Sequence, residues 1–205
     1  MTFIYPTDSN KAHPLPLSPE YKSSIKRAPN KPLIPMRHTL SELTGPVYGH
    51  VRDEDGRGVP NSLVEIWQAN SCGRYVHVRD QHTTPLDPNF TGAGRTQSDA
   101  AGYYRFVTIK PGAYPWGNHH NAWRPAHIHL SVFGHSFVTR LVTQMYFPAD
   151  PLFPFDPIFN SVPDEKARAR MVSSFDLENT QPEWALCYRF DIVLRGKNAT
   201  PMENH

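Results

Sequence analysis

Apolar and polar residues alternate along several short stretches of the chain, and this pattern predicts β-strands. The alternation is clear at residues 47–51 (VYGHV) and 62–68 (SLVEIWQ), and the turn residues DEDGRGVPN stand between them. This arrangement predicts two paired strands. A second turn, at residues 99–102, leads into a stretch that places Tyr104 and Phe106 on one face of a strand.

The same pattern recurs in the second half of the chain. It predicts further strands at residues 126–133, 137–146 and 185–194. One helix is predicted, over residues 164–174, where Pro163 stands just before the first turn. Short strands separated by turns, with little helix, are typical of a β-sandwich.

The first forty residues differ from the rest because prolines punctuate them. Seven prolines in this segment favour extended backbone and exclude a continuous helix. The segment also carries more apolar side chains than a solvated tail needs, among them Phe3, Ile4 and Tyr5. We therefore expect residues 1–40 to form an arm that packs on a partner subunit, with a disordered tail as the alternative. Residues 41–205 would form the β-sandwich domain.

Composition narrows the class of protein. The 205 residues contain 39% hydrophobic and 12% aromatic residues, with a formal net charge of +2, which suits one soluble domain. The 21 basic and 19 acidic residues are scattered, so no basic stripe for nucleic acid is present. The chain has no apolar run of membrane-spanning length and no signal-like start, so a cytoplasmic location is expected. Cys72 and Cys187 are expected to be reduced thiols.

Two histidines in the stretch PAHIHLSV are the first candidates for chemistry. His127 and His129 alternate with Ile128 and Leu130, so both imidazoles would leave the same face of a strand, roughly 7 Å apart. The apolar residues would face a core. Such a pair can bind one metal ion, although a histidine pair satisfied by other contacts is the commoner case.

The other side chains near this pair indicate which metal it would bind, because imidazole suits zinc, copper, iron and nickel alike. The chain has no CxxC and no HExxH motif, so a zinc site of those kinds is disfavoured. The residues that crowd the pair are instead Tyr114, Trp116, Trp123 and Arg124.

Longer strings around these residues are similar to a known family. They are YPWGNHHNAWRPAHIH, SCGRY ending at Tyr75, TGPVYGHVRDEDGRGVPNSLVEIWQAN from Thr44, DQHTTPLDPNFTGAGRTQSDAAGYYRF from Asp80, and TQMYFPADPLFPFDPIF from Thr143. Across residues 40–195 the chain resembles the intradiol ring-cleaving dioxygenases. The resemblance implies a mainly β, single-domain sandwich that cleaves catechols with dioxygen between the two hydroxyl-bearing carbons.

The resemblance also implies a ligand set for a ferric ion, namely Tyr75, Tyr114, His127 and His129. Elementary chemistry agrees in one respect. A tyrosine with an ordinary pKa near 10 is a poor ligand at neutral pH unless a strong Lewis acid displaces its proton, as a trivalent cation can. Two phenolates and two imidazoles therefore favour Fe(III).

By resemblance, three residues act on the substrate or on dioxygen. Tyr114 would double as a base, Arg124 would stabilise negative charge on the substrate, and Gln144 would lie near the dioxygen site. A structural ion pair is the alternative for Arg124, and a backbone hydrogen bond is the alternative for Gln144. The residues that match pocket walls, with core packing as the alternative, are Trp67, Trp116 and Ile158.

Substrate and partner follow from the same resemblance. The catechol and hydroxyquinol enzymes of the family carry an N-terminal helical region, whereas this chain has a proline-rich arm. Protocatechuate is therefore the expected substrate, with catechol and hydroxyquinol as alternatives. A homologous α subunit is the expected partner. The sequence departs from the family at Gly117, where a basic residue is usual, and this puts one charged contact in doubt.

Two non-catalytic interpretations compete with an enzyme. The string GHVRDEDGRGVPNSLVEIW is also typical of transthyretin-like and carboxypeptidase-regulatory-like modules, which are binding or spacer domains. The family's α subunit shares the fold but lacks the iron ligands. All four ligand positions are filled in this chain, which favours a catalytic subunit.

Overall fold

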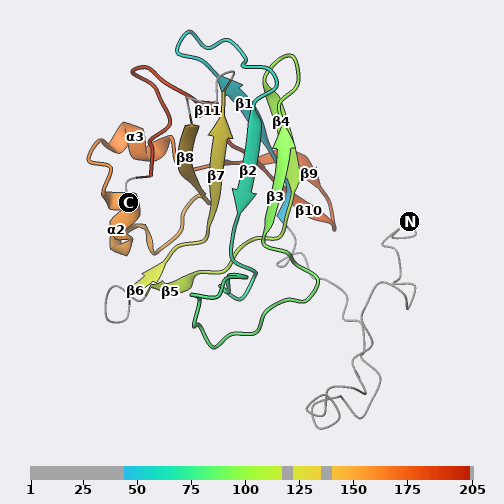
Figure 1. Cartoon of the computed structure of the whole chain (residues 1–205), viewed down its shortest axis with the longest axis vertical. Coiled ribbons are helices and arrows are strands. Elements are labelled where there is room, and N and C mark those ends of the chain that lie inside the picture. Colours follow the sequence, from blue (N-terminus) through green and yellow to red (C-terminus); the bar gives the residue numbers. More distant parts are fainter. Residues whose placement is uncertain (1–43, 117–121, 135–139, 204–205) are drawn as a thin grey trace. The chain divides into compact units, whose positions relative to one another are not determined.

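Two β-sheets packed face to face form the architecture of the chain (Figure 1). The computed structural model describes residues 44–116, 122–134 and 140–203, all of which belong to the unit His38–His205. The predicted arm at residues 1–40 and the departure at Gly117 lie outside the described residues.

The first sheet contains five strands. The central strand β1 (Thr44–Arg52) pairs with β4 (Tyr103–Val107) on one side and runs parallel to β10 (Ala185–Arg189) on the other. Next to β10 lies β9 (Ser174–Gln181), and the short β11 (Ile192–Val193) continues the pairing along the end of β1.

The second sheet contains four antiparallel strands in the order β3–β2–β7–β8. Their bounds are β2 (Leu63–Trp67), β3 (Ala93–Gln97), β7 (His127–Phe133) and β8 (Arg140–Tyr146). A separate ribbon joins β5 (Tyr114–Trp116) to β6 (Ala122–Arg124). The helical elements are short: the 3₁₀-helix η1 (Phe153–Phe155), α2 (Pro157–Asn160) and α3 (Glu165–Ala169).

The core lies between the two sheets. From the first sheet it takes Val47, Val51 and Tyr104, all at most 1% exposed. Ile128 and Leu130 of β7 meet them from the second sheet and are fully buried. The predicted inward face of β7 is therefore confirmed, as is the β-sandwich class. The alternation places the two β7 histidines on the opposite, outer face of the second sheet.

The predicted pairing of residues 47–51 with 62–68 is wrong, although both stretches are strands. They became β1 and β2, which lie in different sheets. The intervening turn closes onto β1 itself, because Gly58 bridges to Arg52 and the Val59 N–H donates to the Val51 carbonyl. The chain then crosses to the other sheet before β2 begins.

The helix predicted at residues 164–174 is shorter in the structure. Asp164 caps it by accepting from the Lys166 N–H, but α3 ends at Ala169. Beyond it the backbone pairs with the end of β8: the Tyr146 N–H donates to the Met171 carbonyl, and the Ser173 N–H donates to the Tyr146 carbonyl. This pairing and the burial of Met171 end the helix.

The strand predicted at residues 185–194 is interrupted. It divides into β10 and β11 at Asp191, whose carboxylate accepts the His50 N–H in place of a backbone carbonyl. The turn at residues 99–102 is confirmed, with the Gly102 N–H donating to the Asp99 carbonyl. Strand β9 was not predicted: its two apolar side chains, Phe175 and Leu177, are exposed, and the rest of the strand is polar.

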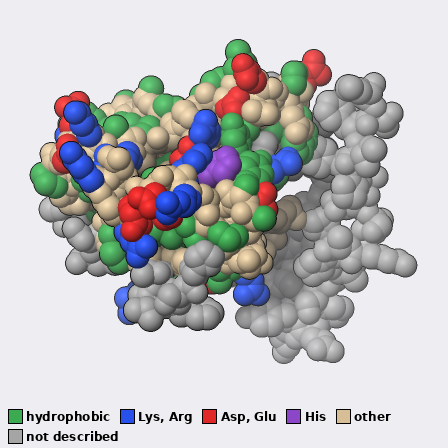
Figure 2. Space-filling model, turned by 90° about the horizontal axis from the view of Figure 1, so that it is seen from above, with side chains coloured by type: hydrophobic (Ala, Val, Ile, Leu, Met, Phe, Trp, Pro, Cys, Tyr) green, Lys and Arg blue, Asp and Glu red, His purple; other side chains and the backbone are tan. Residues whose placement is uncertain are grey.

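Three expectations drawn from composition can be compared with the structure. Cys72 and Cys187 are both free thiols, as expected. In the described residues, no helix is long and apolar enough to cross a membrane. Acidic and basic side chains are interspersed over the face shown in Figure 2, so that face carries no basic stripe.

Candidate metal centre

The candidate site is built on two cross-strand rows of the second sheet. In one row Trp67 of β2, His129 of β7 and Gln144 of β8 lie directly opposite one another. In the next row His127 lies opposite Tyr146. Side chains opposite each other in a sheet share a face and lie close together, so these five leave the sheet on the same side. Trp67 stacks on His129 with ring centroids 4.9 Å apart and planes 5° from parallel.

Two tyrosines reach this face from outside the sheet. Tyr75 lies in the loop after β2, and Tyr114 begins β5. Their segments touch through two glycines: a Cβ at Gly73 would lie 2.1 Å from the Ala113 carbonyl oxygen, and one at Gly112 would lie 2.4 Å from the Ser71 carbonyl oxygen. Only glycine permits this approach, which brings the two tyrosines together. Their rings lie edge to face, with centroids 5.2 Å apart.

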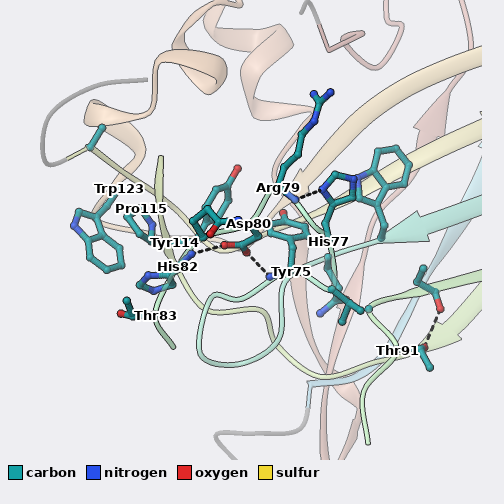
Figure 3. A pocket seen from close by; sticks show the side chains of 17 residues that line it. Tyr75, His77, Arg79, Asp80, His82, Thr83, Thr91, Tyr114, Pro115 and Trp123 are labelled. Carbon is teal, nitrogen blue, oxygen red and sulfur yellow. Dashed lines mark hydrogen bonds between the residues drawn. The ribbon is translucent and has the colours of Figure 1, made fainter. Parts of the chain in front are cut away.

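One carboxylate shapes the loop that carries Tyr75. Asp80 accepts the Tyr75 N–H at 2.7 Å and the His82 N–H at 2.8 Å, one on each oxygen (Figure 3). These two bonds hold both flanks of the loop to a single side chain. The position of the Tyr75 ring is therefore set by local hydrogen bonds as well as by the glycine contact.

Three side-chain atoms that could bind a metal ion converge at the centre of the site. The Tyr75 Oη lies 3.2 Å from the His129 Nε2 and 3.4 Å from the His127 Nε2, and the two Nε2 atoms are 3.2 Å apart. Tyr114 completes the group, with its ring centroid 5.6 Å from that of His127. The structure thus brings together all four residues predicted as ligands.

Each imidazole makes a hydrogen-bond contact through its Nδ1 atom, which leaves its Nε2 atom available to bind a metal ion. The His127 Nδ1–H donates to the Pro125 carbonyl at 2.7 Å, and the His129 Nδ1 lies 3.3 Å from the Glu203 carboxylate. Each Nε2 therefore presents a lone pair, as a metal ligand does. Burial, the Arg124 charge and His129 hold the pKa of His127 well below its usual value, so this imidazole is neutral.

Arg124 lies beside these atoms and is 1% exposed. Its Nε and Nη2 donate to the two oxygens of the fully buried Asp156 at 3.1 and 3.0 Å. Its Nη1 is directed into the site, 3.3 Å from the Tyr114 Oη and 3.2 Å from the His127 Nε2. The structural ion pair that was the alternative for Arg124 exists, and the same guanidinium also reaches the predicted ligands.

The chemistry of this donor set fits a highly charged cation. Burial and the neighbouring Tyr114 hold the pKa of Tyr75 well above its usual value, so its phenolate is unfavourable without a compensating charge. A trivalent ion at the point of convergence would supply that charge. In the part of the chain that the structure describes, no three His, Cys, Asp or Glu side chains are grouped to hold a metal ion.

A pocket of about 1090 Å³ opens beside the tyrosines (Figure 3). Its walls include Trp67, Tyr75 and Tyr114, so two of the predicted ligands border it. Trp123 also lines it and is 40% exposed. A planar aromatic molecule in this pocket would lie next to the phenol groups.

The remaining predicted site residues differ in where they lie. Gln144 is fully buried, and its amide bonds to side chains and not, in the described contacts, to backbone. Ile158 is not among the residues that line the pocket; its backbone N–H donates to Asp156. Trp116 ends β5, and its side chain lies outside the described residues.

Three buried residues of the site were missed by the sequence analysis. Asp156 holds Arg124, Tyr146 donates to Gln144, and Glu203 contacts His129. Asp156 lies inside a string that resembled the family, but nothing in its local pattern marked it as a partner of Arg124. Glu203 lies beyond the matched region, near the chain end.

Comparison with known proteins adds to this geometry. A family model described as "Dioxygenase" matches residues 18–196. The chain is 52% identical over 232 residues to the protocatechuate 3,4-dioxygenase beta chain of Burkholderia cepacia, covering 98% of each protein. It is 32% identical over 155 residues to the alpha chain from the same organism, covering 74% of this chain and 72% of that one.

One solved structure of similar fold is the dioxygenase domain of a dioxygenase carbohydrate-binding protein fusion from Streptomyces sp. SirexAA-E. The TM-score is 0.52 with 26% sequence identity, covering 80% of this chain and 90% of that chain.

A first prediction concerns the contact between the two tyrosine segments. Gly73→Ala should lower the free energy of unfolding by about 1–3 kcal/mol, because the new Cβ would overlap the Ala113 carbonyl and Gly73 has a φ of 77°. Gly94→Ala is the matched control, since the nearest atom to its Cβ would lie 3.7 Å away. Denaturant titration measures both, and equal stability of the two variants would contradict the close approach.

A second prediction concerns pH. With a chelator present, the fold should lose stability as the pH falls below about 6.5, because His127 is neutral when folded and protonates when unfolded. The slope from this one group is up to about 1.4 kcal/mol per pH unit. His127→Gln should lack this component. Denaturant titrations between pH 7 and pH 5 measure it, and parallel curves for the two proteins would show that His127 does not contribute.

Proposed function

The chain belongs to the intradiol ring-cleaving dioxygenases, and we propose that it is the iron-binding subunit of an enzyme that cleaves protocatechuate with dioxygen to 3-carboxy-cis,cis-muconate. The observation that carries this proposal is the convergence of the Tyr75 Oη with the Nε2 atoms of His127 and His129 within 3.4 Å. The full-length similarity to a protocatechuate 3,4-dioxygenase beta chain supports the substrate.

The metal in this proposal is Fe(III), held by Tyr75, Tyr114, His127 and His129. When bound, it would supply a Lewis acid that takes up the two catechol oxygens and makes the ring reactive towards dioxygen. The residues contribute two anionic oxygens and two neutral nitrogens. Such hard, partly anionic donors suit a ferric ion better than zinc, for which cysteine and histidine sets are the common choice.

Proton transfer is assigned to Tyr114. Tyr114 lines the pocket, and its Oη lies 3.3 Å from the Arg124 Nη1, so negative charge on this oxygen is stabilised by a fixed cation. A catechol hydroxyl that reaches this oxygen can therefore transfer its proton to it. Tyr114 would act as the base for one hydroxyl group of the substrate.

Arg124 has the second role in this proposal. Asp156 holds one edge of the guanidinium, which leaves the Nη1 directed at the ligands. Negative charge that develops on the substrate ring would meet a cation that is already oriented. Burial disfavours the charged guanidinium. The hydrogen bonds that Arg124 donates to Asp156 and the electrostatic effects of Tyr146, Tyr114 and Asp156 together outweigh this cost and raise the pKa of Arg124, so the cation persists at all ordinary pH values.

The pocket can distinguish protocatechuate from catechol by charge. Protocatechuate carries a carboxylate, which needs a cation or hydrogen-bond donors. Arg79, His77 and His82 line the pocket and can supply them. Residues of a partner subunit would complete the enclosure.

A homologous α subunit is the partner in this proposal. The chain resembles both the beta and the alpha chain of the Burkholderia cepacia enzyme, and the relation to the beta chain covers far more of the sequence. The arm at residues 1–40, with its prolines and apolar side chains, would pack on that partner, and residues 41–205 would form the catalytic domain.

A third prediction tests the function directly. The purified protein should contain iron and show a broad visible absorption band from tyrosinate bound to Fe(III), and anaerobic 3,4-dihydroxybenzoate should shift the band to longer wavelength. Tyr75→Phe should lower the iron affinity by more than about an order of magnitude. Absorption spectra and metal analysis measure both effects.

The matched control is Tyr103→Phe. Tyr103 packs on Tyr48 and His50 in the first sheet, away from the site, so this variant should keep the band. A colourless, iron-free protein that ignores 3,4-dihydroxybenzoate, even after iron reconstitution with its partner chain, would leave a non-catalytic sandwich as the better interpretation.

A fourth prediction concerns the partner. Co-expression with a homologous α chain should raise both the soluble yield and the dioxygenase activity, because the two chains would share an interface and a pocket wall. Size-exclusion chromatography and oxygen uptake measure these quantities. Full activity of the isolated chain would contradict a pocket shared between subunits.

A further inference from the structure

The carboxylate of Glu203 contacts the site from the edge of the second sheet, beside β8. The Glu203 N–H donates to the Val142 carbonyl at 2.8 Å, which fixes the segment beside β8. Glu203 itself is 7% exposed, and its two oxygens face different residues. Oε1 lies 2.6 Å from the Gln144 Nε2, and Oε2 lies 3.3 Å from the His129 Nδ1.

Arg124 determines which group donates in each of these hydrogen bonds, because a guanidinium can only donate. Its Nη2 donates to the Gln144 Oε1 at 2.6 Å, and the Tyr146 hydroxyl donates to the same oxygen at 2.7 Å. Two donors at one atom require that atom to be the carbonyl oxygen of the amide. The amide NH₂ of Gln144 must then point to Glu203.

Glu203 in turn determines which nitrogen of His129 carries the proton. An ionised carboxylate only accepts, so Oε1 takes the hydrogen bond from the Gln144 amide and Oε2 takes one from the His129 Nδ1–H. With its proton on Nδ1, the His129 ring carries its lone pair on Nε2. That atom is the one that faces the Tyr75 Oη and the His127 Nε2.

We propose that Arg124, Gln144 and Glu203 form a relay of hydrogen bonds of fixed direction that sets the tautomer and orientation of His129, with Glu203 as its positioning residue. The relay explains why an acidic side chain is buried here beside a neutral amide. His127 is independent of it, because its Nδ1–H donates to the Pro125 carbonyl. The value of the relay for catalysis rests on the proposed function, since there His129 is an iron ligand.

Glu203→Gln should break the relay while keeping the shape of the side chain. If the new amide oxygen faces Gln144, its NH₂ faces the His129 Nδ1 and drives the proton to Nε2. If the new amide oxygen faces His129 instead, the NH₂ groups of residues 144 and 203 face each other across the contact that measures 2.6 Å in the natural protein. The first arrangement satisfies both neighbours only by reversing the His129 tautomer, and the second leaves an amide N–H without an acceptor.

The double variant Glu203→Gln with Gln144→Glu should restore the relay. A carboxylate at 144 accepts from the Arg124 Nη2 and from the new amide at 203, whose carbonyl oxygen then accepts from the His129 Nδ1–H. The swap keeps one carboxylate and one amide. Glu203→Asp is a second control, because it shortens the side chain but still only accepts.

The test is the tautomer of His129 in the full-length protein with its iron removed, read by ¹⁵N nuclear magnetic resonance of labelled histidine. Signals are assigned with a His129→Gln variant, and circular dichroism checks that each protein is folded. The expected result is a proton on Nδ1 in the natural protein, in Glu203→Asp and in the double variant, and on Nε2 in Glu203→Gln. The iron affinity of Glu203→Gln should be lower by about 10- to 100-fold.

Two results would overturn the relay. One is a natural protein whose His129 carries its proton on Nε2, which is decisive even if Glu203→Gln does not fold. The other is a folded Glu203→Gln variant whose His129 tautomer is unchanged. Because the readout needs neither iron nor substrate, it separates failure of the relay from failure of the proposed function. A protein with the expected tautomers but no affinity for iron would refute only the latter.

Discussion

The burial of strand β7 on both faces is the constraint on which the site depends. Its neighbours β2 and β8 pair with it along its length, Ile128 and Leu130 pack into the core, and His127 and His129 are covered on the other side. An imidazole buried in this way needs a partner for each ring nitrogen. The Nδ1 atoms have theirs in Pro125 and Glu203, so the Nε2 atoms are left to face a common point.

A second constraint is the buried charge of Arg124. A guanidinium removed from water is costly unless carboxylate and hydrogen-bond partners surround it, and Asp156 supplies the charge. The remaining N–H groups must then find acceptors, and those acceptors are parts of the site: Gln144 and the Tyr114 hydroxyl. The Arg124 guanidinium therefore orients polar groups on two sides of the candidate metal centre, namely the Gln144 amide and the Tyr114 hydroxyl.

The sequence alone could predict what local patterns encode. The alternation around His127 and Ile128 determines which side chains leave which face of β7, and it did so correctly. It could not reveal contacts that join distant segments: Asp156 lies 32 positions from Arg124, and Glu203 lies 74 positions from His129. The pairing of β1 with β2 was wrong for the same reason, since proximity in sequence does not assign a strand to a sheet.

Both tyrosines follow a glycine by two positions, in Gly73-Arg74-Tyr75 and Gly112-Ala113-Tyr114, and this repeated spacing is a signal that the sequence did contain. It has a physical reason, because each glycine touches the backbone of the other tyrosine's segment. The imidazoles thus come from a strand that is buried in the sheet, whereas the phenols come from two segments joined by a close backbone contact. In the proposed function, the two nitrogen ligands would therefore come from one buried strand of the second sheet, and the two oxygen ligands from segments outside that sheet.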